Sequence, residues 1–159
     1  MAANNSAKDA EEHPLIQVFI QVEAGSRERN LYDEKTLEHK GTRRTLLPYP
    51  YPYGFIVGTT AADGDNVDCY VITEDHLKAG TIVECVPVGL LEQEEDGEAD
   101  HKVLAAVPGQ AVTLNQELLD VFRVFIYSVF AQFPGMSVRV GRILPEEQAW
   151  RFIRGFEDS

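Results

Sequence analysis

Three carboxylates, Asp63, Asp65 and Asp68, stand within six residues in the segment DGDNVD. The apolar run 69–72 follows at once, so the acids crowd the mouth of an expected buried strand. Carboxylates this close repel one another, and a divalent ion such as Mg²⁺ or Mn²⁺ removes that repulsion. The spacing therefore predicts a site for hard cations.

A second acidic cluster, at 92–100, lies between two further apolar runs, and Lys102 stands just beyond its end. Four arginines earlier in the chain are candidate contacts for an anion: Arg27, Arg29, Arg43 and Arg44. Carboxylates bind metal and cationic side chains bind phosphate, so the chain carries both halves of a site for metal-dependent phosphate chemistry.

Two other interpretations of the first acidic segment are weaker. A solvated Asp-Gly turn uses one or two acids and does not normally carry a third at the strand entrance. A calcium loop counted from Asp63 would put Glu74 at its last ligand position, but Asp68 stands where that loop needs a glycine. A divalent-metal site for phosphate chemistry is the favoured interpretation.

The acidic balance of the chain limits its partners. Its 159 residues carry 14 basic and 26 acidic side chains, for a net charge of −12. A broad surface for nucleic acid or for an anionic membrane requires a positive footprint, so neither partner is expected. No apolar stretch approaches the roughly 18 residues of a spanning helix, and residues 1–14 lack the apolar segment of a signal peptide, so we expect a cytoplasmic protein.

The apolar periodicity predicts one domain at 15–159 behind a flexible tail at 1–14. Strand-like alternation begins at Leu15 and continues to Val22. Further strands are expected at 43–47, 54–58, 67–73, 81–91 and 102–107. Cys69 and Cys85 fall in such runs without a CxxC spacing and are expected to be reduced, buried thiols.

The last third of the chain adds helices. A long helix is expected to begin at Thr113, with Gln116 completing a weak capping box, and to continue towards Pro134. A strand at 137–143 and a short helix from Pro145 to about Gly155 follow. This mainly β, or α+β, order suits a small barrel closed by helices, and the five-stranded barrel is one candidate.

The segment PYPYPYG at 48–54 is compositionally unusual. Its prolines force an extended path. The segment is either a stiff edge connection or the means by which one or two phenols reach the acidic site, where a hydroxyl can donate to a phosphate oxygen.

Several short motifs occur together in the order of one known family. They are Ala24-Gly25-Ser26-Arg27, Tyr53-Gly54-Phe55-Ile56, Asp63-Gly64-Asp65 with Asp68, Pro87-Val88-Gly89-Leu90-Leu91, Glu95-Asp96-Gly97 with Asp100 and Lys102, and Ala105-Ala106-Val107-Pro108. Over nearly its whole length the chain resembles the soluble, Mg²⁺-dependent inorganic pyrophosphatases. The resemblance implies a distorted five-stranded OB-like β-barrel with one long and one short flanking helix. It also implies hydrolysis of diphosphate to two orthophosphates with several Mg²⁺ ions, or Mn²⁺ or Co²⁺ in their place.

The resemblance further implies roles for single residues. Asp65 would be the general base for a water held between two ions. The metal-binding side chains would be Asp63, Asp68, Asp100, Glu95 and Asp96. The substrate contacts would be Arg29, Tyr53, Lys102, Tyr49 and Arg43.

Some positions depart from the family pattern. Gln21 and Leu31 stand where the family has glutamates, Gly41 where it has a phosphate-binding arginine, and Val129-Phe130 where it has a tyrosine-lysine pair. Glu23 shares the strand face of Gln21 and is a candidate replacement. Arg43 or Arg44 would supply the missing cation if the hairpin before Pro48 shifts register.

Three functions therefore stay open at this point. The first is a working diphosphatase. The second is a weakened relative that binds metal and phosphate compounds or hydrolyses another phosphoanhydride. The third is a non-enzymatic barrel module that binds a partner. The short chain resembles the hexameric type of the family more than the dimeric type, so a homo-oligomer is expected.

Overall fold

The computed structural model describes residues 15–159, so the tail expected at 1–14 lies outside the described residues. The strands are β1 (Ile16–Val22), β2 (Glu28–Tyr32), β3 (His39–Arg44), β4 (Tyr53–Ile56), β5 (Asp68–Val71), β6 (Ile82–Glu95), β7 (Glu98–Ala99), β8 (Lys102–Ala106) and β9 (Val138–Pro145). The helices are α2 (Gln116–Phe130) and α3 (Glu146–Gly155). Neither helix of this described part has the length and apolar content needed to cross a membrane.

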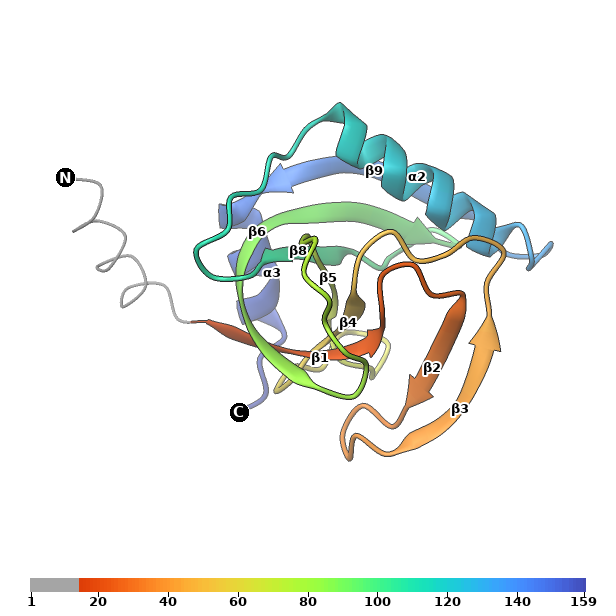
Figure 1. The fold of residues 1–159 in the computed structure, drawn as a ribbon. Helices are drawn as coiled ribbons and strands as arrows, with labels where there is room; N and C mark the ends of the chain where they lie inside the picture. The colour runs from red at the N-terminus through yellow and green to blue at the C-terminus, as the bar shows by residue number, and fades with distance from the viewer. Residues whose placement is uncertain (1–14) are drawn as a thin grey trace.

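Five of these strands close into a barrel (Figure 1). Their order is β1, β4, β5, β8 and β6, and β6 pairs back with β1 to complete the ring. All of these pairings are antiparallel except that of β5 with β8, which is parallel. The expected five-stranded OB-like barrel with one long and one short helix is confirmed.

The curved strand β6 joins the barrel to the rest of the sheet (Figure 1). Its first residues pair with β1, its middle with β8, and its last residues with β9 and β7. The sequence predicted an end at residue 91, but β6 continues to Glu95. Gln93, Glu94 and Glu95 are held in the strand by their partners on β9, which local sequence does not reveal.

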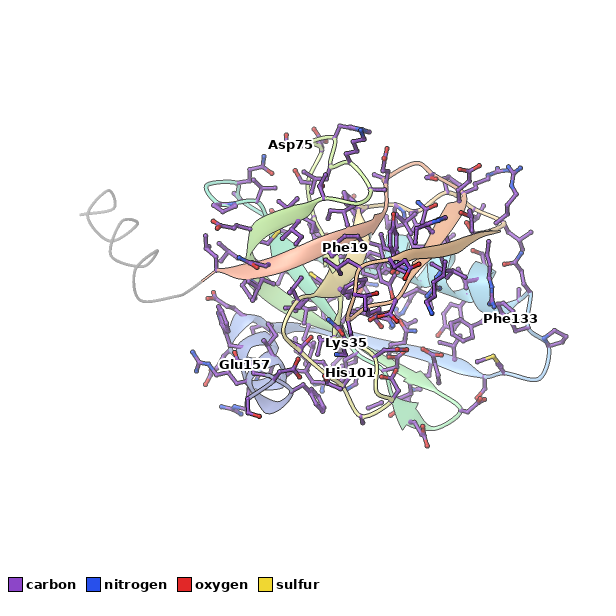
Figure 2. All side chains as sticks on the ribbon, turned by 90° about the horizontal axis from the view of Figure 1, so that it is seen from below. Phe19, Lys35, Asp75, His101, Phe133 and Glu157 are labelled. Carbon is purple, nitrogen blue, oxygen red and sulfur yellow. The ribbon has the colours of Figure 1, made fainter. Side chains whose placement is uncertain are left out.

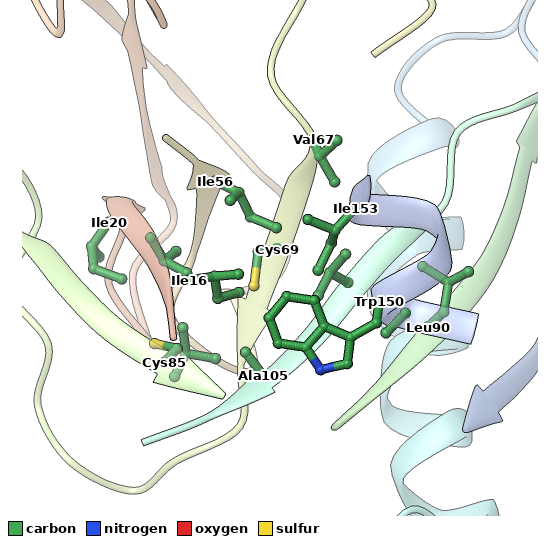
Figure 3. Close-up of a cluster of buried hydrophobic side chains, with 14 residues drawn as sticks. Ile16, Ile20, Ile56, Val67, Cys69, Cys85, Leu90, Ala105, Trp150 and Ile153 are labelled. Carbon is green, nitrogen blue, oxygen red and sulfur yellow. The ribbon is translucent and has the colours of Figure 1, made fainter. Parts of the chain in front are cut away.

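Two clusters of buried apolar side chains lie on opposite faces of β5 and β8. In the first, Trp150 and Ile153 of α3 pack with Cys69 and Ala105 (Figure 3). In the second, α2 packs with Tyr70 and Leu104, which alternate with the members of the first cluster along the two strands. Both cysteines are free and buried, as expected.

The helix boundaries correct one prediction. Helix α2 begins at Gln116, and Asn115 rather than Thr113 caps it: the Asn115 Oδ1 accepts a hydrogen bond from the Leu118 N–H at 3.0 Å. Gln116 does not complete a capping box, because its side-chain amide donates to Asp120. Helix α3 ends at Gly155, as expected. Asparagine is at least as good an N-cap as threonine, so both candidates fitted the pattern.

The β2–β3 hairpin stands beside the barrel as a separate two-stranded sheet (Figure 1). The sequence predicted a strand at 43–47, whereas β3 covers His39–Arg44, and β2 was not predicted. Neither strand contains a fully buried residue, so neither shows the alternation by which a half-buried strand is recognised.

A close approach of two backbones makes Gly54 indispensable to the barrel. A Cβ atom built at Gly54 on β4 would lie 1.7 Å from the Phe19 carbonyl oxygen of β1. No side chain fits there without separating two strands that close the ring.

We therefore expect Gly54→Ala to lower the free energy of unfolding by about 4 kcal/mol or more. Gly155→Ala is the matched control, because nothing lies within 4 Å of its Cβ position. Gly155 is the last residue of α3, and alanine has a higher helix propensity than glycine. Urea unfolding followed by circular dichroism measures both. Equal stability of the two variants would contradict the packing argument.

Candidate active site

One cavity of about 430 Å³ gathers nearly all of the predicted site residues. Those that line it are Arg29, Arg43, Tyr49, Tyr53, Asp63, Asp65, Asp68, Glu95, Asp100 and Lys102. They come from the β2–β3 hairpin, from strands of the barrel, and from the connections between them. The fold therefore brings the acidic segments and the cationic side chains into one hollow.

The loop that carries the first acidic segment, residues 61–68, is called the acidic loop, and hydrogen bonds of its own backbone shape it. The Ala61 N–H donates to the Asp65 carbonyl at 2.7 Å, and the Asp65 N–H donates to the Asp63 carboxylate at 2.9 Å. Gly64 occupies the turn with a φ of 90°, a conformation that glycine adopts without strain. The tight turn holds Asp63 and Asp65 side by side at the cavity.

Lys102 is the buried cation of the site. Its ammonium group donates to the carboxylates of Asp68 at 2.6 Å and Asp100 at 3.0 Å, and the residue is only 6% exposed. Burial disfavours its charge, but the carboxylates of Asp68 and Asp100 outweigh that effect and hold the pKa of the Lys102 ammonium well above its usual range. Asp68 and Lys102 begin the parallel neighbours β5 and β8, so both enter from the same end of the barrel.

Arg29 brings a second charge from the hairpin. Its guanidinium lies over the Tyr53 ring at 5.8 Å from the centroid, and its buried Nε has no hydrogen-bond partner. Burial opposes the positive charge of Arg29, but the nearby Asp68 carboxylate favours it, so the pKa of Arg29 stays raised and the group stays charged. A buried donor without a partner is costly, so this Nε is available to an incoming anion.

The β2–β3 hairpin brings two further arginines to the cavity. Arg29 pairs with Arg43 across β2 and β3, while Leu31 pairs with Gly41. Both Arg43 and Arg44 line the cavity. Arg43 and Arg44 therefore reach the cavity, although Gly41 on the same strand has no side chain to contribute.

The proline-rich segment brings two of its tyrosines to the cavity. Tyr49 and Tyr53 are 2% and 4% exposed, pack tilted against each other, and reach the cavity. Burial raises the pKa of both phenols, which keeps them protonated and able to donate. Tyr51 instead packs against Phe122 of α2.

Two acidic residues lie away from the cavity. The carboxylate of Asp96, at the β6–β7 turn, accepts from the Ser137 N–H at 2.9 Å, so Asp96 is the one predicted ligand that the fold does not bring to the cavity. The suggestion that Glu23 replaces a missing glutamate is wrong, because its carboxylate accepts from the Ala79 N–H at 3.0 Å.

A separate hollow of about 660 Å³ beside α2 contains Glu74, Asp75 and Glu117 but no lysine or arginine.

Sequence reasoning missed a set of hydrogen bonds, made by Glu34 and Lys35, that joins the hairpin tip to the acidic loop. The Lys35 ammonium, at the hairpin tip, donates to the Thr59 carbonyl at 2.9 Å, the Thr60 hydroxyl at 2.7 Å and the Asn66 amide oxygen at 2.6 Å. Beside it, the Glu34 carboxylate accepts from the Asn66 N–H at 2.9 Å. Figure 2 labels Lys35. A lysine in a polar turn carries no sequence signal for such a role.

These hydrogen bonds place a further carboxylate, that of Glu34, near the acidic loop. Burial raises the pKa of the Glu34 carboxyl to about 7, and the charge of Asp68 adds to the shift. Burial, Asp63 and Asp68 also raise the pKa of Asp65. These shifts mark a concentration of negative charge that bound cations would relieve.

The donor atoms at the cavity suit hard divalent ions. The carboxylates of Asp63, Asp65, Asp68, Glu95 and Asp100 offer oxygen ligands only, as Mg²⁺ and Mn²⁺ prefer. Within residues 15–159, no three acidic, histidine or cysteine side chains already form a group that could hold an ion. Lys102 now bridges Asp68 and Asp100, so ion binding requires these side chains to rearrange.

Comparisons with known proteins agree with this chemistry. The family model "Inorganic pyrophosphatase" matches residues 18–131. An inorganic pyrophosphatase of Nanoarchaeum equitans is 29% identical over 91% of this chain and 96% of its own length, and one of Aeropyrum pernix is 31% identical over 88% and 86%. An inorganic phosphatase structure from Anaplasma phagocytophilum superposes with a TM-score of 0.78 at 27% identity, covering 88% of this chain and 90% of its own.

We expect Lys35→Met to loosen the acidic loop. Loss of three hydrogen bonds should accelerate amide hydrogen exchange of Asn66 and Val67 by about tenfold or more. Lys40→Met, on the same hairpin, is the control, because Lys40 only approaches Asp33 at 3.8 Å on the surface. Amide exchange is measured by NMR. Unchanged protection at Asn66 in Lys35→Met would mean that the hydrogen bonds of Lys35 do not hold the acidic loop in place.

The raised pKa of Glu34 makes the metal-free fold sensitive to pH. The unfolded carboxyl ionises near 4.5 and the folded one near 7, so stability falls as pH rises through this interval. Glu34→Gln keeps an acceptor for Asn66 and removes the charge. After allowance for solvent screening of a half-buried group, it should stabilise the metal-free protein by about 1 kcal/mol at pH 8 and have no effect at pH 4. Urea unfolding in a chelator at both pH values tests this, and equal shifts at the two would contradict it.

Proposed function

The chain belongs to the inorganic pyrophosphatase family, and from this membership we propose that its acidic cavity is the site at which diphosphate is hydrolysed to two orthophosphates. Family and relatives make the protein an inorganic diphosphatase that depends on a divalent metal. The observation that carries the proposed site is the meeting of the loop carboxylates with Lys102 and Arg29 in one cavity.

Asp65 is the proposed general base. It stands in the tight turn beside Asp63, and its raised pKa brings it closer to the pH at which a base accepts a proton efficiently. It would take the proton of the attacking water, which then adds to phosphorus as the bridging oxygen leaves. Asp63, Asp68, Asp100 and Glu95 would hold the metals, and we give Asp96 no part because Ser137 already engages its carboxylate.

Divalent ions, once bound, would lower the pKa of the attacking water and neutralise the diphosphate oxygens. We propose Mg²⁺ as the ion, with Mn²⁺ or Co²⁺ as substitutes, on the basis of the oxygen-only donors. The chain itself supplies the remaining positive charge. Arg29 and Arg43 reach the cavity from one side and Lys102 from the other, so they can bind the two phosphoryl groups of the substrate.

The phenols of Tyr49 and Tyr53 would orient the substrate. Both are buried and protonated, so each can donate to a phosphate oxygen. Because buried groups are held in place by packing, their donors need little reorganisation when charge shifts onto the leaving phosphate.

We also propose that copies of the chain form a homo-oligomer, a hexamer rather than a dimer, with 15–159 as one domain. The support is the outer side of α2, where Val121, Val124 and Tyr127 are 41%, 64% and 43% exposed. Neighbouring exposed apolar side chains of this kind are typical of surfaces that become buried on association.

Asp65→Asn tests the proposed base. We expect it to lower phosphate release from diphosphate at millimolar Mg²⁺ by a factor of about 10²–10⁴, since general-base catalysis is worth that much. Its melting temperature should stay close to that of the wild type, because asparagine keeps the size and turn preference of the side chain.

Asp120→Asn, an exposed substitution on α2, is the matched control and should keep full activity. Release by Asp65→Asn at the rate of this control would overturn the assignment. No release by the wild-type protein above buffer would overturn the proposed function itself.

A further inference from the structure

One side of the cavity is apolar. It is formed by Leu31, Val129, Phe130, Phe133 and Met136, which we call the apolar wall. Phe133 and Met136 are 41% and 43% exposed, so the wall is open to solvent in the isolated chain. Figure 2 shows Phe133 on the opposite side of the molecule from Glu157.

The apolar wall offers no charge to a phosphate group. Helix α2 has no basic residue in its last turn, and Gln132 is the only polar residue of 125–136 that lines the cavity. All cations of the cavity lie elsewhere in its lining, on the β2–β3 hairpin and on β8. The cavity therefore has a charged part that suits a diphosphate and an apolar part that diphosphate alone does not use.

The size of the cavity agrees with this division. Its volume of about 430 Å³ falls within the range of roughly 300–1,000 Å³ that is usual for sites that enclose drug-sized ligands. Inorganic diphosphate is much smaller than such ligands. The exposed side chains of Phe133 and Met136 would lose contact with water if an apolar group covered them, which favours binding of such a group.

We infer that the site also accepts diphosphate monoesters whose organic group is apolar, with the terminal phosphoryl group among the carboxylates and the organic group on the apolar wall. The inference rests on the proposed function, because it uses the same catalytic residues. Water adds to the terminal phosphorus, and the bond from that phosphorus to the bridging oxygen breaks. The electron pair stays on that oxygen, which leaves as an organic phosphate monoester, and the water proton passes to Asp65. No oxidant or reductant is needed.

A second copy of this chain is the other possible occupant of the apolar wall. The ester is favoured because the wall lies within the same cavity as the anion-binding charges, so one ligand can satisfy both parts. A subunit covering the wall would leave the phosphate groups bound without it. The two occupants predict different effects of substitutions in the wall.

Benzyl diphosphate is the probe, with methyl diphosphate as the ester that cannot reach the wall and inorganic diphosphate as the reference. We expect kcat/KM for the benzyl ester to exceed that for the methyl ester about tenfold or more at millimolar Mg²⁺, which is the usual gain from filling an apolar subsite. Phe130→Ser and Phe133→Ser should remove most of this preference. Ile82→Ser, on β6 outside the cavity and 48% exposed, should leave it unchanged.

Binding measured without turnover keeps the test decisive. Calorimetry with the methylene-bridged analogues of the benzyl and methyl esters should show the same preference, and its loss in Phe133→Ser. Equal binding and equal kcat/KM of the two esters would overturn the inference, while hydrolysis of inorganic diphosphate would leave the proposed function standing. If no substrate is hydrolysed, the proposed function fails and the analogue binding alone decides the inference. A change of oligomeric state in Phe133→Ser, with the ester preference intact, would assign the wall to a second copy and overturn the inference.

Discussion

The ammonium group of Lys102, held between the carboxylates of Asp68 and Asp100, is the interaction on which the site depends. A buried charge is tolerated only when partners repay its loss of water, and here both partners are themselves charged. Because Asp68 and Lys102 begin neighbouring parallel strands, the ion pair also ties the acidic loop to the barrel end. The acids of both acidic segments thus have a cation among them before any metal arrives.

The second requirement is that the β2–β3 hairpin and the acidic loop keep a fixed relation, since the hairpin forms a sheet of its own and the loop leads into strand β5 of the barrel. Lys35 and Glu34 provide it by bonding to Thr59, Thr60 and Asn66. Arg29 and Arg43 of the hairpin are in this way kept in the same cavity as Asp65 of the acidic loop. Positioning of this kind accounts for much of the catalysis in phosphoryl transfer, where the protein forms few covalent bonds.

The departures from the family pattern have different outcomes in the structure. Gly41 contributes no side chain, but Arg43 and Arg44 of the same strand line the cavity. The changes at Leu31 and at Val129-Phe130 are not offset by charge, and they turn one side of the cavity apolar. Gln21 is buried at 5% exposure and contributes no carboxylate. The cavity therefore keeps Asp63, Asp65, Asp68 and Asp100 beside its cations, while its apolar side differs from the family pattern.

The sequence by itself indicated the chemistry and most of the barrel, because DGDNVD crowds its acids regardless of context and because β1, β5 and β8 consist mainly of apolar residues. Only the tertiary structure decided which charges meet. Partners distant in the chain decide where β2 forms and where β6 ends. They also decide that Asp96 bonds to Ser137 and that Lys35 bonds to Asn66. Periodicity reports the face that a residue presents, whereas pairing between distant segments is set by how the barrel closes.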